Sequence, residues 1–382
     1  MQTAARTTAW SIGLAALLAA VVVVSAGIGP VRIPPAEVAK VVLNALVVPA
    51  GVEFGGRGSG LLSVVNAHLV YRSPFAFPVQ ATHEQIVMRV RLPRILLAAL
   101  VGFALAAAGT VMQGFFRNPM ADPSIIGVSS GAAVGAVGFI VFPVSLSTTL
   151  AVPLLGPTEV GLSYGAGVSL FAFVGALAAA FLVYAIATRH GRTPVATLLL
   201  AGVAVQTFLG AVISYLQLQA GESLRRIVAW LMGHLAGASW SDVTVTLVIV
   251  PPLFFLLLAY TRDLNVLLLG EEEAQGLGIE VERTKRILLA ASALITAAGV
   301  AFAGVIGFVG LIIPHMLRLV VGPDHRILLP TAALGGASFL VAADTLARSG
   351  VTGAELPVGV VTAAVGAPFF IYLLTKREVH EL

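Results

Sequence analysis

The sequence is dominated by long runs that carry no charged residue. A helix needs about 20 apolar residues to cross a bilayer, because about 30 Å of hydrocarbon is crossed at about 1.5 Å per residue. A series of such runs predicts a polytopic, all-α membrane protein. The runs are Thr7–Val31, Ile95–Phe116, Pro123–Thr158, Val160–Thr188, Thr193–Gly221, Val243–Thr261, Ile287–Leu317, Ile327–Ala343 and Leu356–Thr375.

Two runs are longer than one span requires. Ile287–Leu317 is expected to form two helices that meet near Gly304, because the glycines in this run favour a break. Dividing this run brings the total from nine to ten spans, in a single transmembrane domain over residues 1–382. Pro123–Thr158 is expected to hold one span as far as about Phe142, followed by a loop broken by Pro143, Pro153 and Pro157.

The composition agrees with lipid as the surrounding medium. Hydrophobic residues make up 58% of the chain and charged residues only 10%, and the mean hydropathy is +0.99. A soluble domain usually has about a quarter of its residues charged. The sequence has no cysteine, which excludes disulfides, zinc–thiolate sites and cysteine nucleophiles.

The basic residues favour a topology with both termini in the cytoplasm, because short cytoplasmic loops are enriched in Lys and Arg. The short outer loops then hold only Arg225, Arg226 and Arg348. The long first outer loop, about residues 29–90, is exempt from the rule, and its part 49–84 is expected to be an irregular insert. The cytoplasmic segments hold Arg6, Arg117, Arg189, Arg192, Arg262, Arg283, Lys285, Arg286, Arg318, Arg326, Lys376 and Arg377.

No motif in the sequence indicates catalysis. A phosphate-binding loop needs a lysine after glycine, whereas the three lysines follow alanine or threonine. Residues 127–131 match G-x-S-x-G, but close packing of small residues explains them better than a hydrolase elbow. Asp344 could serve in an ion-coupling relay, although a partly buried ion pair, with Arg348 close by, or a polar contact to a neighbouring helix is the simpler interpretation. We therefore expect no enzyme activity in this chain.

Four segments are too specific for generic membrane sequence. Together they closely resemble the permease family of ABC importers for vitamin B12, ferric siderophores and haem, over about residues 88–378, and the insert at 49–84 departs most from that family. The segments are RLPR at 91–94, QGFFRNPMADP with IGVSSGA at 113–132, LGEEEAQGLG at 269–278, and GVIGFVGLIIPH through DHR to ELPVG at 304–359.

The resemblance implies an architecture and a set of partners. It implies a type II ABC importer permease fold with about ten transmembrane helices, acting as a homodimer in the cell membrane with the path at the dimer interface. It also implies two ATPase subunits on the cytoplasmic side, which bind ATP and magnesium, and a soluble or tethered substrate-binding protein outside. No cofactor in this chain and no nucleic-acid partner are expected.

The loop 261–283 is expected to couple the permease to the ATPase subunits. Helix propensity is high between its glycines, so a short rigid helix is expected where the family places its coupling helices. The alternative is a merely solvated charged loop. The coupling residues are Gly270, Glu271, Glu272, Glu273, Ala274, Gln275, Gly276, Leu277 and Gly278.

Arg91, Arg94 and Arg348 fall outside on this topology, against the charge bias. Exposed arginines could anchor the helix ends near headgroups. They could also dock carboxylates of the binding protein, because a guanidinium pairs bidentately with a carboxylate. The family resemblance favours docking.

Two turns are candidate gates at the cytoplasmic face. Pro119 ends the second span and frees carbonyls that Asn118 can help to satisfy. The gate residues are Asn118, Pro119 and Met120 in this turn, and Val195, Ala196 and Thr197 at the start of the fifth span.

The cargo is not encoded in any one motif. Residues 269–378 look most like vitamin B12 permeases, whereas Trp230–Leu235 looks equally like siderophore and haem permeases. His234 could contact haem iron, although a surface histidine is the simpler interpretation. We expect cobalamin, with a ferric siderophore or haem as the alternative and an ion-coupled secondary transporter as the rival class.

Overall fold

The computed structural model describes residues 2–46, 48–56, 65–144, 147–152, 156–161, 163–349 and 355–376. Within these residues, seven helices are long and apolar enough to cross a membrane, and three shorter apolar helices accompany them. These ten apolar helices correspond to the ten expected spans, and seven of them have the length that a span requires. The long helices are α1 (Gln2–Gly27), α4 (Leu92–Phe115), α6 (Tyr164–Ala187), α7 (Val195–Leu218), α9 (Trp240–Ala259), α12 (Val281–Ala303) and α14 (His325–Arg348), and the shorter ones are α5 (Val128–Val141), α13 (Val309–Val321) and α15 (Val358–Lys376).

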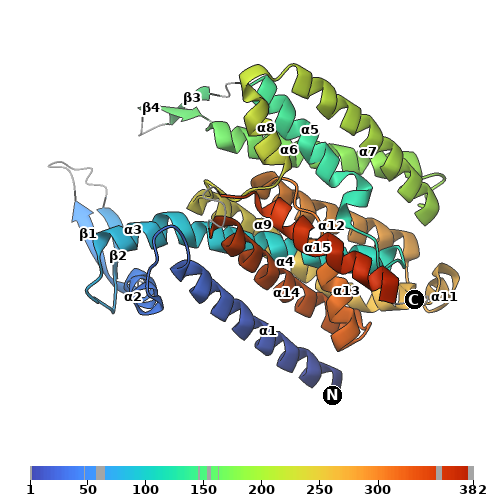
Figure 1. Ribbon diagram of the computed structural model, residues 1–382, viewed down its shortest axis with the longest axis horizontal. Coiled ribbons are helices and arrows are strands. Elements are labelled where there is room, and N and C mark those ends of the chain that lie inside the picture. The colour runs from blue at the N-terminus through green and yellow to red at the C-terminus, as the bar shows by residue number, and fades with distance from the viewer. Residues whose placement is uncertain are drawn as a thin grey trace.

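The remaining elements lie at the two ends of the helix bundle (Figure 1). The end that carries α11 also holds the N-terminal end of α1 and the described end of α15, and we call it the α11 end. The opposite end carries the strands, and we call it the hairpin end. The short helices are α2 (Pro35–Ala45), α3 (Ala81–Gln85), α8 (Leu224–Leu231), α10 (Thr261–Leu267) and α11 (Glu271–Gly276), with a π-helical turn at Ile86–Arg91 and 3₁₀ turns at Pro123–Ile126 and Gly221–Ser223.

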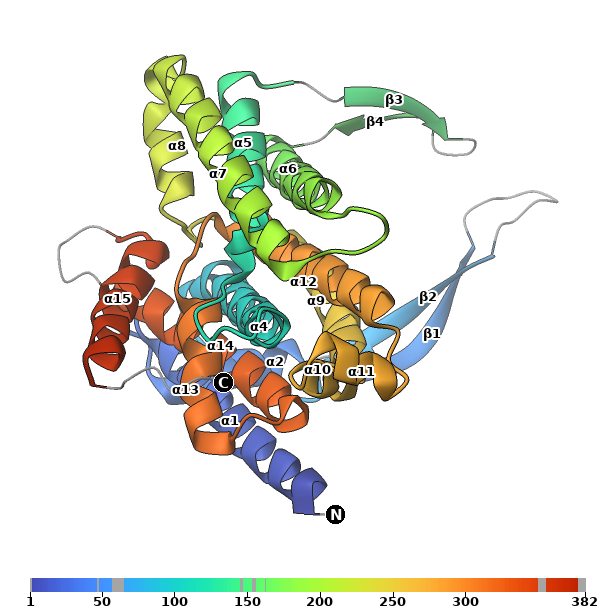
Figure 2. The ribbon, with the colours of Figure 1, turned by 90° about the vertical axis from the view of Figure 1, so that its right-hand side faces the viewer.

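Helix α4 is the centre of the bundle. It packs against α9, α12, α13 and α14, and its residues are largely buried. In the view along its length it lies in the middle of the bundle (Figure 2). Helices α5, α6 and α7 pack on one another at one side, and α1 packs against α14 at the other. The peripheral helices expose much of their apolar surface, as is typical of helices that face lipid.

Glycines bring the helix backbones into close contact. A Cβ on Gly109 of α4 would lie 1.9 Å from the Gly310 carbonyl oxygen of α13. A Cβ on Gly131 of α5 would lie 2.3 Å from the Gly175 carbonyl oxygen of α6. Such contacts tolerate only glycine, and they drive helix association in a membrane. They confirm that the segment 127–131 packs helices rather than forming a hydrolase elbow.

The break in the longest apolar run is where the glycines predict it. Helix α12 ends at Ala303 and α13 begins at Val309. Gly304 adopts φ +71°, and an added Cβ would lie 2.2 Å from the Trp230 carbonyl oxygen. Both the backbone angle and the contact require glycine here.

The two outer segments expected to be irregular contain hairpins, so this expectation is wrong for their described parts. In the insert 49–84, β1 (Val48–Gly56) pairs antiparallel with β2 (Val65–Arg72), and α3 follows. After α5, β3 (Ser147–Val152) pairs antiparallel with β4 (Gly156–Gly161). Residues 57–64 of the insert and Pro153 lie outside the described residues. Backbone pairing between strands satisfies the polar groups that an irregular loop would leave to water.

Candidate functional site

The candidate coupling segment contains the short helix α11, which lies at one end of the helix bundle (Figure 1). Helix α11 spans Glu271–Gly276 and is bounded by Gly270 and Gly278, whose φ angles are +143° and +85°. A side chain is strained in this backbone region, and a Cβ on Gly270 would also lie 1.6 Å from Glu273 Oε2. The expected short helix between glycine breaks is confirmed, and its role in coupling stays a prediction.

The surface of this segment combines apolar and acidic side chains. Leu269 and Leu277 are each 66% exposed on either side of α11. Glu272, Glu273 and Gln275 are exposed between them. Exposed apolar side chains bordered by charged ones are typical of a protein–protein interface. The α11 segment therefore offers a contact surface for another protein.

Lys285 ties α11 to its surroundings. Its side chain is only 4% exposed, and its ammonium lies 2.7 Å from Glu271 Oε1 and 3.1 Å from Glu282 Oε1. It also donates to the Thr193 carbonyl at 3.0 Å. These three acceptors match the three protons of an ammonium. The buried cation is therefore fully paired, and it joins α11, the first turn of α12 and the turn before α7.

A groove of about 420 Å³ lies between the coupling segment, the residues directly before the first candidate gate, and Val195 of the second candidate gate. Glu271–Glu273 line one side of this groove, and Phe116 and Arg117 at the end of α4 line another, with Val195 at the start of α7. Asn118, Pro119, Met120, Ala196 and Thr197 are not among its lining residues. The sequence treated coupling and gating as separate segments, and the structure makes them neighbours. The gate role itself stays a prediction.

The turn after α4 is closed by Asn118. Its Oδ1 accepts a hydrogen bond from the Met120 N–H at 2.9 Å, and its own N–H donates to the Gln113 carbonyl at 3.1 Å. The sequence predicted that Asn118 would help to satisfy the carbonyls freed at this helix end. This is confirmed, because the backbone N–H of Asn118 satisfies the Gln113 carbonyl, while its side chain satisfies the Met120 N–H.

Hydrogen bonds hold α10, which leads into α11, against the start of α14, and the end of α4 packs beside them. Asn265 Nδ2 donates to Asp324 Oδ1 at 2.7 Å, and Asn265 Oδ1 lies 2.7 Å from His325 Nδ1 and accepts from the His325 N–H at 3.0 Å. His325 is 1% exposed. A Cβ on Gly114 would lie 2.6 Å from His325 Nε2. The segment before α11 is therefore fixed to the core of the bundle.

The three arginines expected to be exposed for docking lie together at the hairpin end, but they are buried. Arg91, Arg94 and Arg348 are 4%, 9% and 5% exposed. Arg94 pairs with Asp344 at 3.0 Å and with Glu355 at 2.9 Å. The expectation of exposure is wrong, because each guanidinium is bonded within the chain.

The other two arginines hold the end of α1. Arg348 donates to the carbonyls of Ile28 at 2.6 Å and Ser25 at 2.5 Å, and its Nε lies 3.4 Å from Asp344. Arg91 donates to the carbonyls of Ala26 and Val31. The ion pair of Asp344 with Arg348, preferred from the sequence over an ion-coupling relay, is confirmed. Both arginines satisfy carbonyls that α1 leaves open where it ends.

A cavity of about 290 Å³ at the hairpin end contains His234, Arg226 and Asp242. His234 lies between α8 and α9 and is partly buried, not the surface histidine that the sequence favoured. Burial and, to a lesser extent, the charge of Arg94 lower the pKa of His234 below its usual value. A neutral imidazole is therefore favoured at this position near pH 7.

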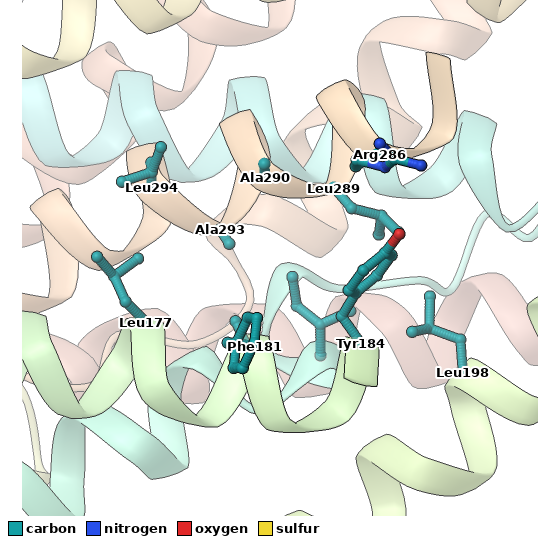
Figure 3. A pocket seen from close by; sticks show the side chains of 11 residues that line it. Leu177, Phe181, Tyr184, Leu198, Arg286, Leu289, Ala290, Ala293 and Leu294 are labelled. Carbon is teal, nitrogen blue, oxygen red and sulfur yellow. The ribbon is translucent and has the colours of Figure 1, made fainter. Parts of the chain in front are cut away.

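A second cavity, of about 280 Å³, lies between α6, α7 and α12 (Figure 3). Tyr184 and Arg286 are the only polar side chains in its lining. Phe181 and Leu177 extend from α6 toward the side of α12 that carries Ala293 and Leu294 (Figure 3). The lining suits hydrocarbon rather than a polar cargo.

The sequence missed several residues of the α11 end. Lys285 had a signal, because it is one of three lysines in the chain, but its pairing depends on a turn 92 positions away. Asn265 and His325 are brought together from separate helices, which no local pattern predicts. Across the described residues, no three His, Asp or Glu side chains cluster as a metal site.

The chain is similar to known membrane permeases. The sequence profile of the FecCD transport family matches residues 16–376. A cobalamin import system permease protein, BtuC, of Halobacterium salinarum is 53% identical over the full length of both chains. A hemin transport system permease protein, HmuU, of Yersinia pestis is 41% identical over 91% of this chain and 98% of its own.

A solved structure supports the same fold. A metal-chelate type ABC transporter in an inward-facing conformation superposes with a TM-score of 0.74 and 30% identity, and the match covers 96% of this chain and 99% of the other.

Proposed function

The chain belongs to the FecCD transport family, and we propose that it is the membrane permease of an ATP-driven importer that carries cobalamin. The observation that carries this proposal is the 53% identity to a cobalamin permease across the entire chain. The haem permease is less similar, at 41%, and supports haem as the second candidate cargo. An ion-coupled transporter is disfavoured, because Asp344 is held by Arg94 and Arg348.

The α11 end is the proposed contact with two ATPase subunits, one for each copy of a homodimer. Leu269 and Leu277 provide apolar contact area, and the exposed glutamates border it. Both described chain ends lie toward this end (Figure 1), so the proposed topology places both termini in the cytoplasm. ATP and magnesium would be bound by the ATPase, and this chain would need no cofactor of its own.

The hairpin end is the proposed docking face for an extracytoplasmic binding protein. Docking by Arg91, Arg94 and Arg348 stays part of this proposal, but it requires partner carboxylates to compete with the carboxylates already in place. Glu355 is the accessible competitor, since its side chain is 48% exposed while it pairs with Arg94. The remaining bonds of these arginines fix α1, α4 and α14 at this face.

The cargo can be tested at the binding protein. Candidate ATPase and binding-protein partners would be co-expressed with the chain, and the binding protein that assembles with it would be titrated with cyanocobalamin, haemin and a ferric siderophore. We expect tight binding of cyanocobalamin alone. Tight binding of haemin without cyanocobalamin would replace the proposed cargo with the second candidate.

A further inference from the structure

We infer that Lys285 is the positioning residue through which α11 and the N-terminal end of α7 move as one unit, an inference that rests on the proposed function. The ammonium binds Glu271 of α11, Glu282 of α12 and the carbonyl of Thr193 before α7. These acceptors come from three separate segments. A single buried cation is therefore the shared contact of the coupling helix and the start of the fifth span.

Glu282 provides a second connection between Lys285 and Thr193. Its Oε1 accepts from Lys285, and its Oε2 accepts from the Thr193 N–H at 3.1 Å. Thr193 is 1% exposed and is thus held at both its N–H and its carbonyl. A displacement of this charged cluster is a displacement of Thr193, two residues before α7 begins at Val195.

The turn before Thr193 is closed on itself. Arg189 and Arg192 exchange backbone hydrogen bonds of 3.0 Å in both directions, and His190 and Gly191 between them have positive φ. Such a turn has little freedom to absorb a displacement. A shift at Thr193 is therefore passed on to α7 rather than lost in a flexible loop.

The groove beside Lys285 explains why this link is needed. Glu271–Glu273 and Val195 line the groove of about 420 Å³ from different sides, so open space lies between α11 and the start of α7 there. If α11 moved alone, the buried Lys285 ammonium would keep Glu282 and the Thr193 carbonyl but would leave one of its three N–H donors without an acceptor. A buried donor without an acceptor is unfavourable, so the two elements are expected to move together.

The test compares Lys285→Met with Lys285→Arg in the complete importer. Lys285→Met keeps much of the side-chain volume and removes the positive charge, whereas Lys285→Arg keeps the positive charge. We expect the Met variant to assemble and hydrolyse ATP, but to import about tenfold less cobalamin per ATP hydrolysed, a change within the usual range of coupling between sites. Lys285→Arg should have a ratio of cobalamin imported to ATP hydrolysed close to that of the wild type.

The matched control is Arg326→Met, in the first turn of α14 at the same end of the bundle. Arg326 is exposed and lies outside the coupling loop 261–283, so its loss should leave the ratio unchanged. An unchanged ratio in Lys285→Met would overturn the inference. An equal loss of this ratio in Lys285→Met and Lys285→Arg would also overturn the inference, because it would indicate that Lys285 acts only through packing. If Lys285→Met fails to assemble, Glu271→Gln must show the same uncoupling, and an unchanged ratio there would also contradict the inference.

A second readout does not depend on the cargo. The chain has no cysteine, so spin labels can be placed on the exposed positions Gln275 and His190 alone. We expect the distance between the two labels within one copy to have a narrow distribution that is retained on nucleotide binding, and a broad distribution in Lys285→Met. If the label distances behave as expected but cobalamin is not imported, only the proposed cargo is contradicted. A narrow distribution in Lys285→Met would count against the inference.

Discussion

Arg94 and Asp344 are 250 residues apart in the chain and form a forked ion pair. The Arg94 Nε lies 3.0 Å from Oδ1 and 3.1 Å from Oδ2, and Nη2 lies 3.0 Å from Oδ1. The Asp344 side chain is 1% exposed and is shared with Arg348. This arrangement joins α4 to α14 at the hairpin end, so residues expected to face a partner instead support the fold.

Replacing Asp344 by Ala should destabilise the protein strongly. Two buried arginines would lose their shared carboxylate, and breaking a buried pair in this way costs about 3–5 kcal/mol. Thermal unfolding in detergent, followed by loss of the monodisperse peak, measures the effect. Glu280→Ala, which removes the exposed partner of Arg283, is the control and should melt like wild type. Equal melting of both variants would contradict a structural role for Asp344.

Replacing Glu355 by Gln tests docking by Arg94. The change removes the accessible competitor for the guanidinium and leaves the Asp344 pair in place. Affinity for the binding protein should rise by up to about fivefold, since a partly exposed pair is worth about 0–1 kcal/mol. Surface-immobilised binding protein and a salt series measure it. An affinity that stays constant or falls would count against docking at Arg94.

Replacing Gly109 by Ala should prevent normal packing of α4. The new methyl would lie 1.9 Å from the Gly310 carbonyl oxygen, so the two helices must separate and lose contacts along their length. Gly138→Ala is the control, because an added Cβ there meets no atom within 4 Å. Yield and melting temperature should fall for Gly109→Ala alone, and a pair of normal melting curves would refute the close packing.

Replacing Leu269 and Leu277 by Ser should weaken association with the ATPase. Each leucine is 66% exposed, and burying a leucine at an interface is worth about 1.5–3 kcal/mol. Co-purification of the ATPase should fall by about tenfold or more, while insertion of the permease is retained. Val90→Ser, an exposed apolar change at the hairpin end, should leave co-purification unchanged. Retained association in the leucine variant would place the contact elsewhere.

His234 should make the protein less stable in mild acid. Its pKa in the folded state is below its ordinary value near 6.5 because of burial and Arg94. Above that value the imidazole is neutral in both states, so it adds no pH dependence. As pH falls below about 6.5 the unfolded state gains the proton first, and stability is lost. The difference between the melting temperatures at pH 7.5 and 5.5 should therefore be smaller in His234→Gln than in the wild type, and an unchanged difference would contradict this cause.

The span pattern could be predicted because it depends on local sequence. Runs without charge fixed the spans, and the glycine at position 304 marked the break between α12 and α13. The glycines around α11 predicted its boundaries for the same reason. Backbone angles and apolar length are properties of neighbouring residues, and they are read from the chain directly.

The burial of the arginines could not be predicted in this way. A basic residue at a helix end can be solvated or paired, and the choice depends on what the fold places opposite it. Asp344 lies 250 residues from Arg94, and Ser25 lies 323 residues from Arg348. The sequence did not predict the hairpins for a related reason, because Gly- and Pro-rich segments are compatible both with irregular loops and with short paired strands.

ATP-driven uptake is the most direct test of the central claim. The permease would be reconstituted in proteoliposomes with its ATPase, and the binding protein would be supplied outside with labelled cyanocobalamin. We predict accumulation of the label that requires ATP at the α11 face and the binding protein at the opposite face, with no effect of proton or sodium gradients. Accumulation driven by an ion gradient without ATP, or ATP-driven accumulation of haemin but not of cyanocobalamin, would contradict the account.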